Sequence, residues 1–244
     1  MTRPARPPSP VVRKSPLRHR LHRTTGTATG LLLLYLIGTG LPLQLSGPLD
    51  LGNRYVSSHR ILDWYGIGTA ESGWQSNGVS FVGGFVFSGE RPVVEAQAFQ
   101  GAVVLDDLVA VATGSALLLV PPHADVVETL RLPEPVHRIG RADGRVVIDT
   151  TGGLRSLHLE SLELVPEDAA PDTVEWAHLM TLTGATLAPY ADAARTRVLT
   201  LERLLQDLHS GRVFGAAGEW LVSLASLALV ALALSGFWIW WRSR

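Results

Sequence analysis

Cysteine is absent from all 244 residues, and lysine occurs once, as Lys14. Without cysteine the chain has no disulfide bonds, thiolate metal sites, iron–sulfur clusters or cysteine nucleophiles. A phosphate-binding P-loop needs a lysine after a glycine-rich turn, and Lys14 follows no such turn. The Gly-x-Ser-x-Gly signature of serine hydrolases and the His-Glu-x-x-His signature of zinc proteases are also missing. We therefore expect a non-catalytic protein with no metal site.

Acidic residues are missing from positions 1–46, which hold 7 of the 21 basic residues. Residues 47–241 hold all 22 acidic residues and 12 basic ones, and Arg242 and Arg244 follow. The net charge of −1 therefore conceals two basic ends around an acidic middle. A soluble nucleic-acid binder would not separate its charges in this way, whereas a membrane protein does so. We expect no nucleic-acid partner.

Charged residues are absent from two long apolar runs, residues 24–49 and 220–241. Both runs exceed the roughly 20 residues that a helix needs to cross the hydrocarbon core of a bilayer. The second ends in Phe237-Trp238-Ile239-Trp240-Trp241 before Arg242, an aromatic belt followed by a cationic stop. Neither run has a polar stripe, which argues against two buried helices of a soluble core. We expect transmembrane helices at 24–46 and 216–241.

The first run also resembles a cleavable signal peptide in its basic flank, which includes Arg13, Lys14 and Arg23. Its apolar stretch is longer than the usual core of about 7–15 residues, and no Ala-x-Ala site follows. An uncleaved signal anchor is therefore the favoured interpretation, with cleavage as the alternative. Because basic flanks mark the cytoplasmic side, we expect both termini in the cytoplasm and the middle of the chain on the far side of the membrane, which is the periplasm in a Gram-negative bacterium.

Between the two apolar runs, residues 79–165 contain short β-branched segments separated by glycine, aspartate and proline. Val79–Val82 and Phe85–Phe87, for example, flank Gly83-Gly84. This pattern predicts antiparallel hairpins. The expected fold class is a membrane α+β protein, in which two transmembrane helices flank a β-rich extracytoplasmic domain.

The β-rich region contains a weak internal repeat. Asp107–Val111 and Gly144–Ile148 lie 37 residues apart, and each leads into a glycine turn and another apolar segment. Propeller blades recur at about 40–45 residues. At that period, residues 79–165 would hold two units, too few to close a propeller. We therefore expect an antiparallel meander or a small sandwich.

Residues 200–215 return to helical spacing. Leu201, Leu204, Leu205 and Leu208 fall on one helical face, while Glu202, Arg203 and Asp207 fall on the other. We expect an amphipathic juxtamembrane helix that lies along the membrane surface. The remaining segments are expected to be a disordered basic tail (1–23), an interfacial segment (47–78), a linker (166–199) and a cytoplasmic end (242–244).

Small residues recur in and beside the apolar runs. Gly26 and Gly30 are four residues apart, as are Gly211 and Gly215. This spacing lets helices approach closely, so we expect either packing of the two spans or dimerisation.

Histidines lie next to both apolar runs. His22 precedes the first, and His209 precedes the second. A neutral histidine at the end of a membrane helix is a candidate haem ligand. In the expected topology the two histidines lie on opposite sides of a bilayer core of about 30 Å, so one haem cannot join them within a chain. Contact with lipid headgroups is the simpler interpretation, and His59, His123, His137, His158 and His178 are interpreted as surface residues.

Both ends of the chain resemble the PepSY-associated transmembrane family. The first end carries Leu21-His22-Arg23, then Gly26, Gly30, a leucine run and Thr39-Gly40-Leu41. The second carries Asp207–Arg212, Phe214-Gly215 and Leu234–Trp238, and Leu62–Gly66 is similar to the segment after the first helix of two-span members. The resemblance implies a bacterial inner-membrane protein with an extracytoplasmic insert.

Larger relatives with more spans are linked to iron uptake and ferric reduction, in which membrane histidines are thought to hold haem. The resemblance places His22 and His209 at the matching positions, although this chain has two spans. No cofactor is required by the sequence, and haem b is the candidate. PepSY domains proper are associated with peptidase inhibition, but residues 79–165 do not resemble that domain.

The function that we expect is that of a membrane-anchored periplasmic binding or accessory protein. Its expected partners are the lipid bilayer and either another membrane or periplasmic protein or a second copy of the chain. The alternative is a haem-binding subunit for electron transfer or iron uptake, with His22 and His209 on separate haems. A weaker alternative is a regulator of a periplasmic peptidase.

Overall fold

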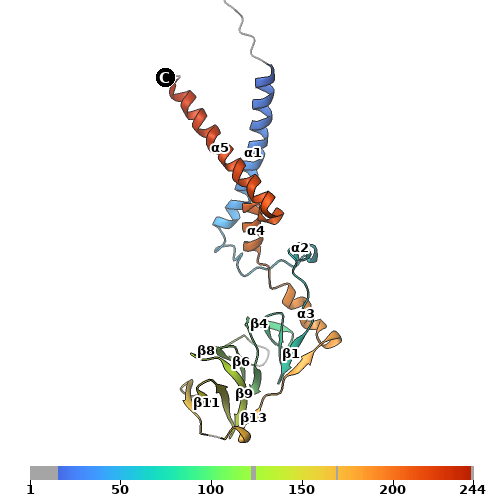
Figure 1. The fold of residues 1–244 in the computed structure, drawn as a ribbon, viewed down its shortest axis with the longest axis vertical. Helices are drawn as coiled ribbons and strands as arrows, with labels where there is room; N and C mark the ends of the chain where they lie inside the picture. The colour runs from blue at the N-terminus through green and yellow to red at the C-terminus, as the bar shows by residue number, and fades with distance from the viewer. Residues whose placement is uncertain (1–15, 122–124, 169, 243–244) are drawn as a thin grey trace, which may run out of the picture. The chain divides into compact units, whose positions relative to one another are not determined.

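A computed structural model describes residues 16–121, 125–168 and 170–242 (Figure 1). The chain forms two compact units, one from residues 1–54 and 200–244 and the other from Tyr55–Leu199. The first unit joins the two ends of the sequence and is helical. The second contains all the strands of the described residues.

The helical unit contains α1 (Pro16–Gln44), α4 (Leu201–Ser210), the short 3-10 helix η3 (Arg212–Phe214) and α5 (Gly215–Arg242). Within it, α1 and α5 approach each other beside α4 and separate toward their other ends (Figure 1). Two stretches are long and apolar enough to cross a membrane, Gly26–Gln44 and Arg212–Arg242. Only 6% and 0% of their most apolar windows are buried, which is unlike the core helices of a soluble protein.

α4 has clear end signals. Thr200 is its N-cap and accepts a hydrogen bond from the backbone N–H of Arg203 at 3.1 Å. Gly211 is its C-cap, at φ +81°.

α4 is bonded at both ends to α1 or to the chain that follows α1. At its N-terminus the Leu201 N–H donates to the Arg54 carbonyl at 2.7 Å. At its C-terminus, α4 packs against α1 through Leu208 and His209. It therefore runs beside the end of α1 and the residues that follow it.

The second unit contains three antiparallel sheets, each built on four consecutive strands (Figure 1). The first sheet has the order β14-β1-β2-β3-β4, the second β5-β6-β7-β8 and the third β12-β11-β10-β9-β13. The bounds of the strands are β1 Gly73–Ser76, β2 Val79–Val82, β3 Phe85–Ser88, β4 Arg91–Glu95, β5 Gly101–Val104, β6 Val109–Thr113, β7 Ala116–Val120, β8 Glu128–Arg131, β9 Val136–Ala142, β10 Arg145–Thr150, β11 Gly153–His158, β12 Glu163–Pro166, β13 Glu175–Trp176 and β14 Met180–Leu182.

The second sheet is the middle layer of this unit. Alternate residues of β6 belong to two different cores: Ala110 and Ala112 pack with the third sheet, and Val109 and Val111 with the first. All five residues of β6 are consequently buried, and its first four are all apolar instead of alternating with polar ones. A third core cluster lies between the first sheet and α3 (Ala188–Arg195), and includes Phe87.

The region holds three four-stranded meanders, Gly73–Glu95, Gly101–Arg131 and Val136–Pro166, of 23, 31 and 31 residues. The turns between their strands are short, so the units recur at a shorter period than the roughly 40–45 residues of propeller blades. The repeat noticed in the sequence is real: β6 and β10 are the second strands of consecutive meanders. The antiparallel meander itself is confirmed.

Several expected boundaries differ from the structure. The stretch 166–199, expected to be a linker, contains η1 (Pro171–Thr173), β13, β14, η2 (Gly184–Thr186) and α3. The expected interfacial segment 47–78 contains α2 (His59–Trp64) and β1. Of the expected disordered tail 1–23, residues 16–23 belong to α1, and residues 1–15 lie outside the described part of the chain. Strands of two or three residues were missed because cross-strand pairing, and not their own composition, holds them.

Candidate functional site

His209, in the last turn of α4, contacts the second half of α1. Its Nδ1 lies 2.9 Å from the Oγ1 of Thr39. The ring also lies against Gly40, because a Cβ built on that glycine would be 3.1 Å from the His209 Cε1. A larger residue at position 40 would therefore push the imidazole away from Thr39.

Two tautomers of His209 fit its contact with Thr39, and the other hydrogen bonds of Thr39 favour one of them. The single hydroxyl hydrogen of Thr39 is donated to backbone carbonyls one turn earlier in α1, at 2.9 Å from the Tyr35 oxygen and 3.3 Å from that of Leu36. The Thr39 oxygen is then an acceptor toward His209, so the imidazole donates from Nδ1. A neutral ring in this tautomer keeps a lone pair on Nε2 for a metal ion or a donor.

A second hydrogen bond joins the same two helices, because the hydroxyl of Tyr35 donates to the backbone carbonyl of Leu208. Leu208 is in the last turn of α4, and its carbonyl also accepts the capping hydrogen bond from the Gly211 N–H at 3.0 Å. Tyr35, Thr39, Gly40, Leu208 and His209 together form a polar contact that we call the α1–α4 clasp. The clasp connects the end of the first apolar stretch with the residues that lead into the second.

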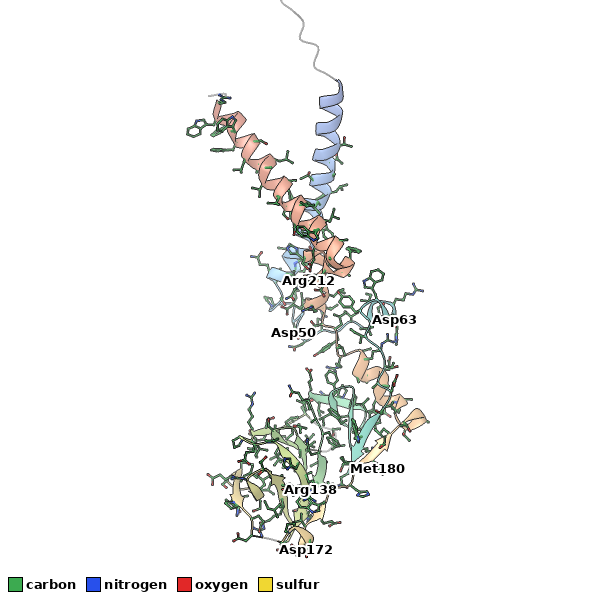
Figure 2. All side chains as sticks on the ribbon, viewed as in Figure 1. Asp50, Asp63, Arg138, Asp172, Met180 and Arg212 are labelled. Carbon is green, nitrogen blue, oxygen red and sulfur yellow. The ribbon has the colours of Figure 1, made fainter. Side chains whose placement is uncertain are left out.

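The turn from α4 into α5 depends on two glycines. A Cβ on Gly218 would lie 2.1 Å from the Gly211 carbonyl oxygen, and a Cβ on Gly211 would lie 2.4 Å from that of Gly218. Figure 2 labels Arg212 at this turn, where its Nε donates to the Glu219 Oε1 at 3.1 Å. Gly211 and Gly215 have positive φ angles, so their spacing serves this turn and not helix packing as we had expected. No atom lies within 4 Å of a Cβ built on Gly26 or Gly30, so within the described residues these two pack against no neighbouring helix.

The two predicted haem ligands are not brought together. His22 is a residue of α1, and its side chain lies outside the described part of the structure. It is 17 residues before Thr39, about 26 Å along a helix. His59, His137, His158 and His178 are exposed, as expected, and His123 lies outside the described residues. Within residues 16–121, 125–168 and 170–242, no three histidine, aspartate or glutamate side chains form a possible metal site.

Two residues of the helical unit have positions that sequence reasoning missed. Thr39 is the partner of His209, although its only signal was its place beside Gly40 in a leucine-rich run. Asp207 was assigned to the exposed face of α4, but it is 4% exposed and accepts a hydrogen bond from the Nε of Arg203 at 3.1 Å.

The second compact unit, Tyr55–Leu199, is called the β unit below. It has an open groove of about 1120 Å³ between its first and second sheets. One wall is the chain from the end of β4 to Gln97, and the other is formed by the β6–β7 hairpin and β8. β4 and β8 are terminal strands of their sheets, so among the described residues each has one edge without a paired strand. We call this opening the inter-sheet groove. A smaller cavity of about 370 Å³ lies between β8 and the third sheet.

Comparison with known proteins gives one result. The family model described as PepSY-associated TM region matches residues 3–243. None of the curated proteins and none of the solved structures that were compared matches the chain. The match covers both apolar stretches and the β unit between them, and it supports a membrane protein of the PepSY type. This chain belongs to the PepSY-associated transmembrane family.

Proposed function

We propose that this chain is a non-catalytic, membrane-anchored binding or accessory protein whose β unit holds the partner. In this proposal the two apolar helices cross the inner membrane of a bacterium, both termini are cytoplasmic, and the β unit is periplasmic. The basic ends and the acidic middle of the sequence support this orientation.

The observation that carries the proposal is the inter-sheet groove. Its volume, about 1120 Å³, reaches the size of a ligand site, and its walls mix apolar residues such as Val94 and Leu118 with polar ones such as Gln97 and Thr129. The exposed edges of β4 and β8 also leave backbone groups available to a bound chain. Such a surface suits recognition, because the described residues of the groove lining are mainly apolar and uncharged polar ones, with Glu95 and Arg131 as the charged side chains and no histidine or aspartate.

A photo-crosslinking experiment tests this proposal in the producing cell. A photoreactive phenylalanine analogue is placed at Gln97 or Thr129 in the groove, and at Glu160, an exposed turn residue outside it, as the control. We expect irradiation to join the two groove positions, but not position 160, to one protein, which mass spectrometry of the purified adduct then identifies. Equal adducts at all three positions, or none at the groove, would contradict the proposal.

A haem-binding subunit for electron transfer or iron uptake is the second candidate, and the tautomer of His209 favours it. Ligating histidines commonly donate from the other ring nitrogen to a neighbouring acceptor. The Nδ1 of His209 has such a partner in Thr39, which leaves Nε2 for iron. The residues thus fit one axial ligand, and a bound haem would supply one-electron chemistry. His22 cannot complete the same site within one chain, so the second ligand would come from another molecule.

An oxidised-minus-reduced absorption spectrum of the purified protein, produced with adequate haem, distinguishes the two candidates. A Soret band with sharp α and β bands in the reduced protein, lost in His209→Ala and kept in His178→Ala, would support haem binding. A featureless spectrum of the unaltered protein would remove His209 from consideration as a ligand. In that case the α1–α4 clasp is a structural contact, and the binding role of the β unit is unaffected.

A further inference from the structure

A cavity of about 370 Å³ lies between β8 of the second sheet and β10–β12 of the third. Its apolar lining comes from Leu130, Leu132, Leu162 and Leu164, and each of these four is partly buried against the core between the two sheets. Arg155 also lines it. The cavity is thus a leucine-lined opening at the edge of the core, and it contains one cationic group from the middle of a sheet.

Arg155 lies on the core-facing side of the third sheet. It is the cross-strand partner of Ile148, and two residues further along β11 Leu157 is the partner of Val146. Cross-strand partners point to the same face of a sheet, and Ile148, Leu157 and Val146 are all core residues. Alternation along the strand therefore predicts an apolar residue at position 155. An arginine there needs an explanation.

No acidic side chain of residues 16–121, 125–168 or 170–242 forms an ion pair with Arg155. The only carboxylate in the cavity wall belongs to Glu134, and it accepts a hydrogen bond from the Gly152 N–H at 2.6 Å. Arg131 also lines the cavity, so its cationic groups outnumber its acidic one. A partly buried arginine without a carboxylate partner among the described residues favours the entry of an anion.

We propose that this cavity binds the carboxylate of a small apolar acid. The planar guanidinium of Arg155 donates two parallel hydrogen bonds to the carboxylate, and the apolar body of the ligand packs against the leucines. The volume lies at the lower end of the range of about 300–1,000 Å³ for ligand pockets, which suits one or two residues or a short acyl chain. The inference rests on the proposed function in taking the β unit as the binding module.

Two sources share this chemistry: the free C-terminus of an apolar peptide and a short-chain fatty acid. The full chain in lipid nanodiscs is titrated with N-acetyl-alanyl-leucine, with its C-terminal amide and with hexanoate, and binding is followed by saturation-transfer NMR. Since hydrogen bonds to charged groups contribute about 1.5–3 kcal/mol, we expect the peptide acid to bind at least tenfold more tightly than its amide. Tighter binding of the peptide acid than of hexanoate indicates a peptide C-terminus, and the reverse indicates an acyl chain.

Arg155→Met keeps an unbranched apolar stem and removes the charge, so it should abolish the preference for acid over amide. The matched control is Arg145→Met on the neighbouring strand, since Arg145 does not line the cavity and pairs with Glu167 at 3.4 Å. Circular dichroism shows whether each variant is folded, and the comparison of acid with amide in the unaltered protein needs no variant. The proposal is overturned if acid and amide bind equally or if no probe binds at millimolar concentration. It is also overturned if Arg145→Met reduces the preference for acid over amide as much as Arg155→Met does. Failure here together with successful crosslinking at the inter-sheet groove would reject this site alone.

Discussion

The hydroxyl oxygen of Thr39 lies 2.9 Å from the Nδ1 of His209, although the two residues are 170 positions apart in the sequence. Thr39 is 9% exposed and belongs to the last part of the first apolar stretch, and His209 belongs to the turn of α4 that precedes the second. The bond therefore joins the two halves of the helical unit at the point where α1 and α4 meet. Its removal should weaken the unit without changing either apolar helix.

Thr39→Val keeps the shape of the side chain but removes the acceptor for His209. A buried N–H that loses its partner costs about 1–3 kcal/mol, so we expect the free energy of unfolding to fall by that amount. Thr39→Ser keeps the hydroxyl and should lose clearly less. The measurement is unfolding in mixed detergent micelles, followed by circular dichroism. Equal stability of the valine and serine variants would show that the bond contributes nothing.

Gly218→Ala should disrupt the turn between α4 and α5, because its Cβ would lie 2.1 Å from the carbonyl oxygen of Gly211. Since the obstacle is backbone and cannot rotate away, we expect a loss of about 3 kcal/mol or more in the same assay. Gly236→Ala is the matched control in the same helix: a Cβ there meets no atom within 4 Å, and alanine favours a helix by about 1 kcal/mol. If the two variants have the same free energy of unfolding, the turn does not require glycine at position 218.

Arg195 connects α3 with α2 and should not tolerate lysine. Its side chain is 9% exposed; its Nε donates to the Ile67 carbonyl at 2.8 Å, and its guanidinium pairs with Asp63 (labelled in Figure 2). Lysine has no planar fork to meet both partners, so we expect Arg195→Lys to lose about 1–3 kcal/mol. The rate of hydrogen exchange of the α2 backbone amides should rise in the same variant. Arg91→Lys, an exposed arginine paired with Asp125 at 3.0 Å, should change stability by less than about 1 kcal/mol.

The absence of cysteine makes the proposed topology directly testable, because any cysteine introduced is the only one. A membrane-impermeant thiol reagent added to cells with a permeable outer membrane should label Glu160→Cys in the β unit. It should label Ser9→Cys, near the N-terminus, only after the inner membrane is opened. Labelling in the opposite order would reverse the orientation, labelling of both positions before the inner membrane is opened would show that residue 9 is exported as well, and no labelling of position 9 at any stage would point to a cleaved chain.

The strands that could be predicted from the sequence are those whose own residues are β-branched and apolar. β2 and β3 were expected at their observed positions, because Gly83-Gly84 separates two apolar runs. In the structure both glycines have positive φ angles, as a tight turn requires. β9 was missed, because its sequence Val-His-Arg-Ile-Gly-Arg-Ala has no apolar run. Its Gly140 is required by a neighbour distant in sequence: a Cβ there would lie 2.7 Å from the Glu175 carbonyl oxygen of β13. Such a close approach leaves no local signal.

The sequence alone determined the two apolar stretches, their charged flanks and the β-rich middle, because length, composition and period act locally. Only the tertiary structure decided that three sheets stack in order, that Arg155 faces a core, and that α4 runs beside α1. Each of these depends on contacts between residues far apart in the chain. The position of His209 before an apolar helix can be read from the sequence. Its contact with Thr39, which orients the imidazole ring, can be seen only in the tertiary structure.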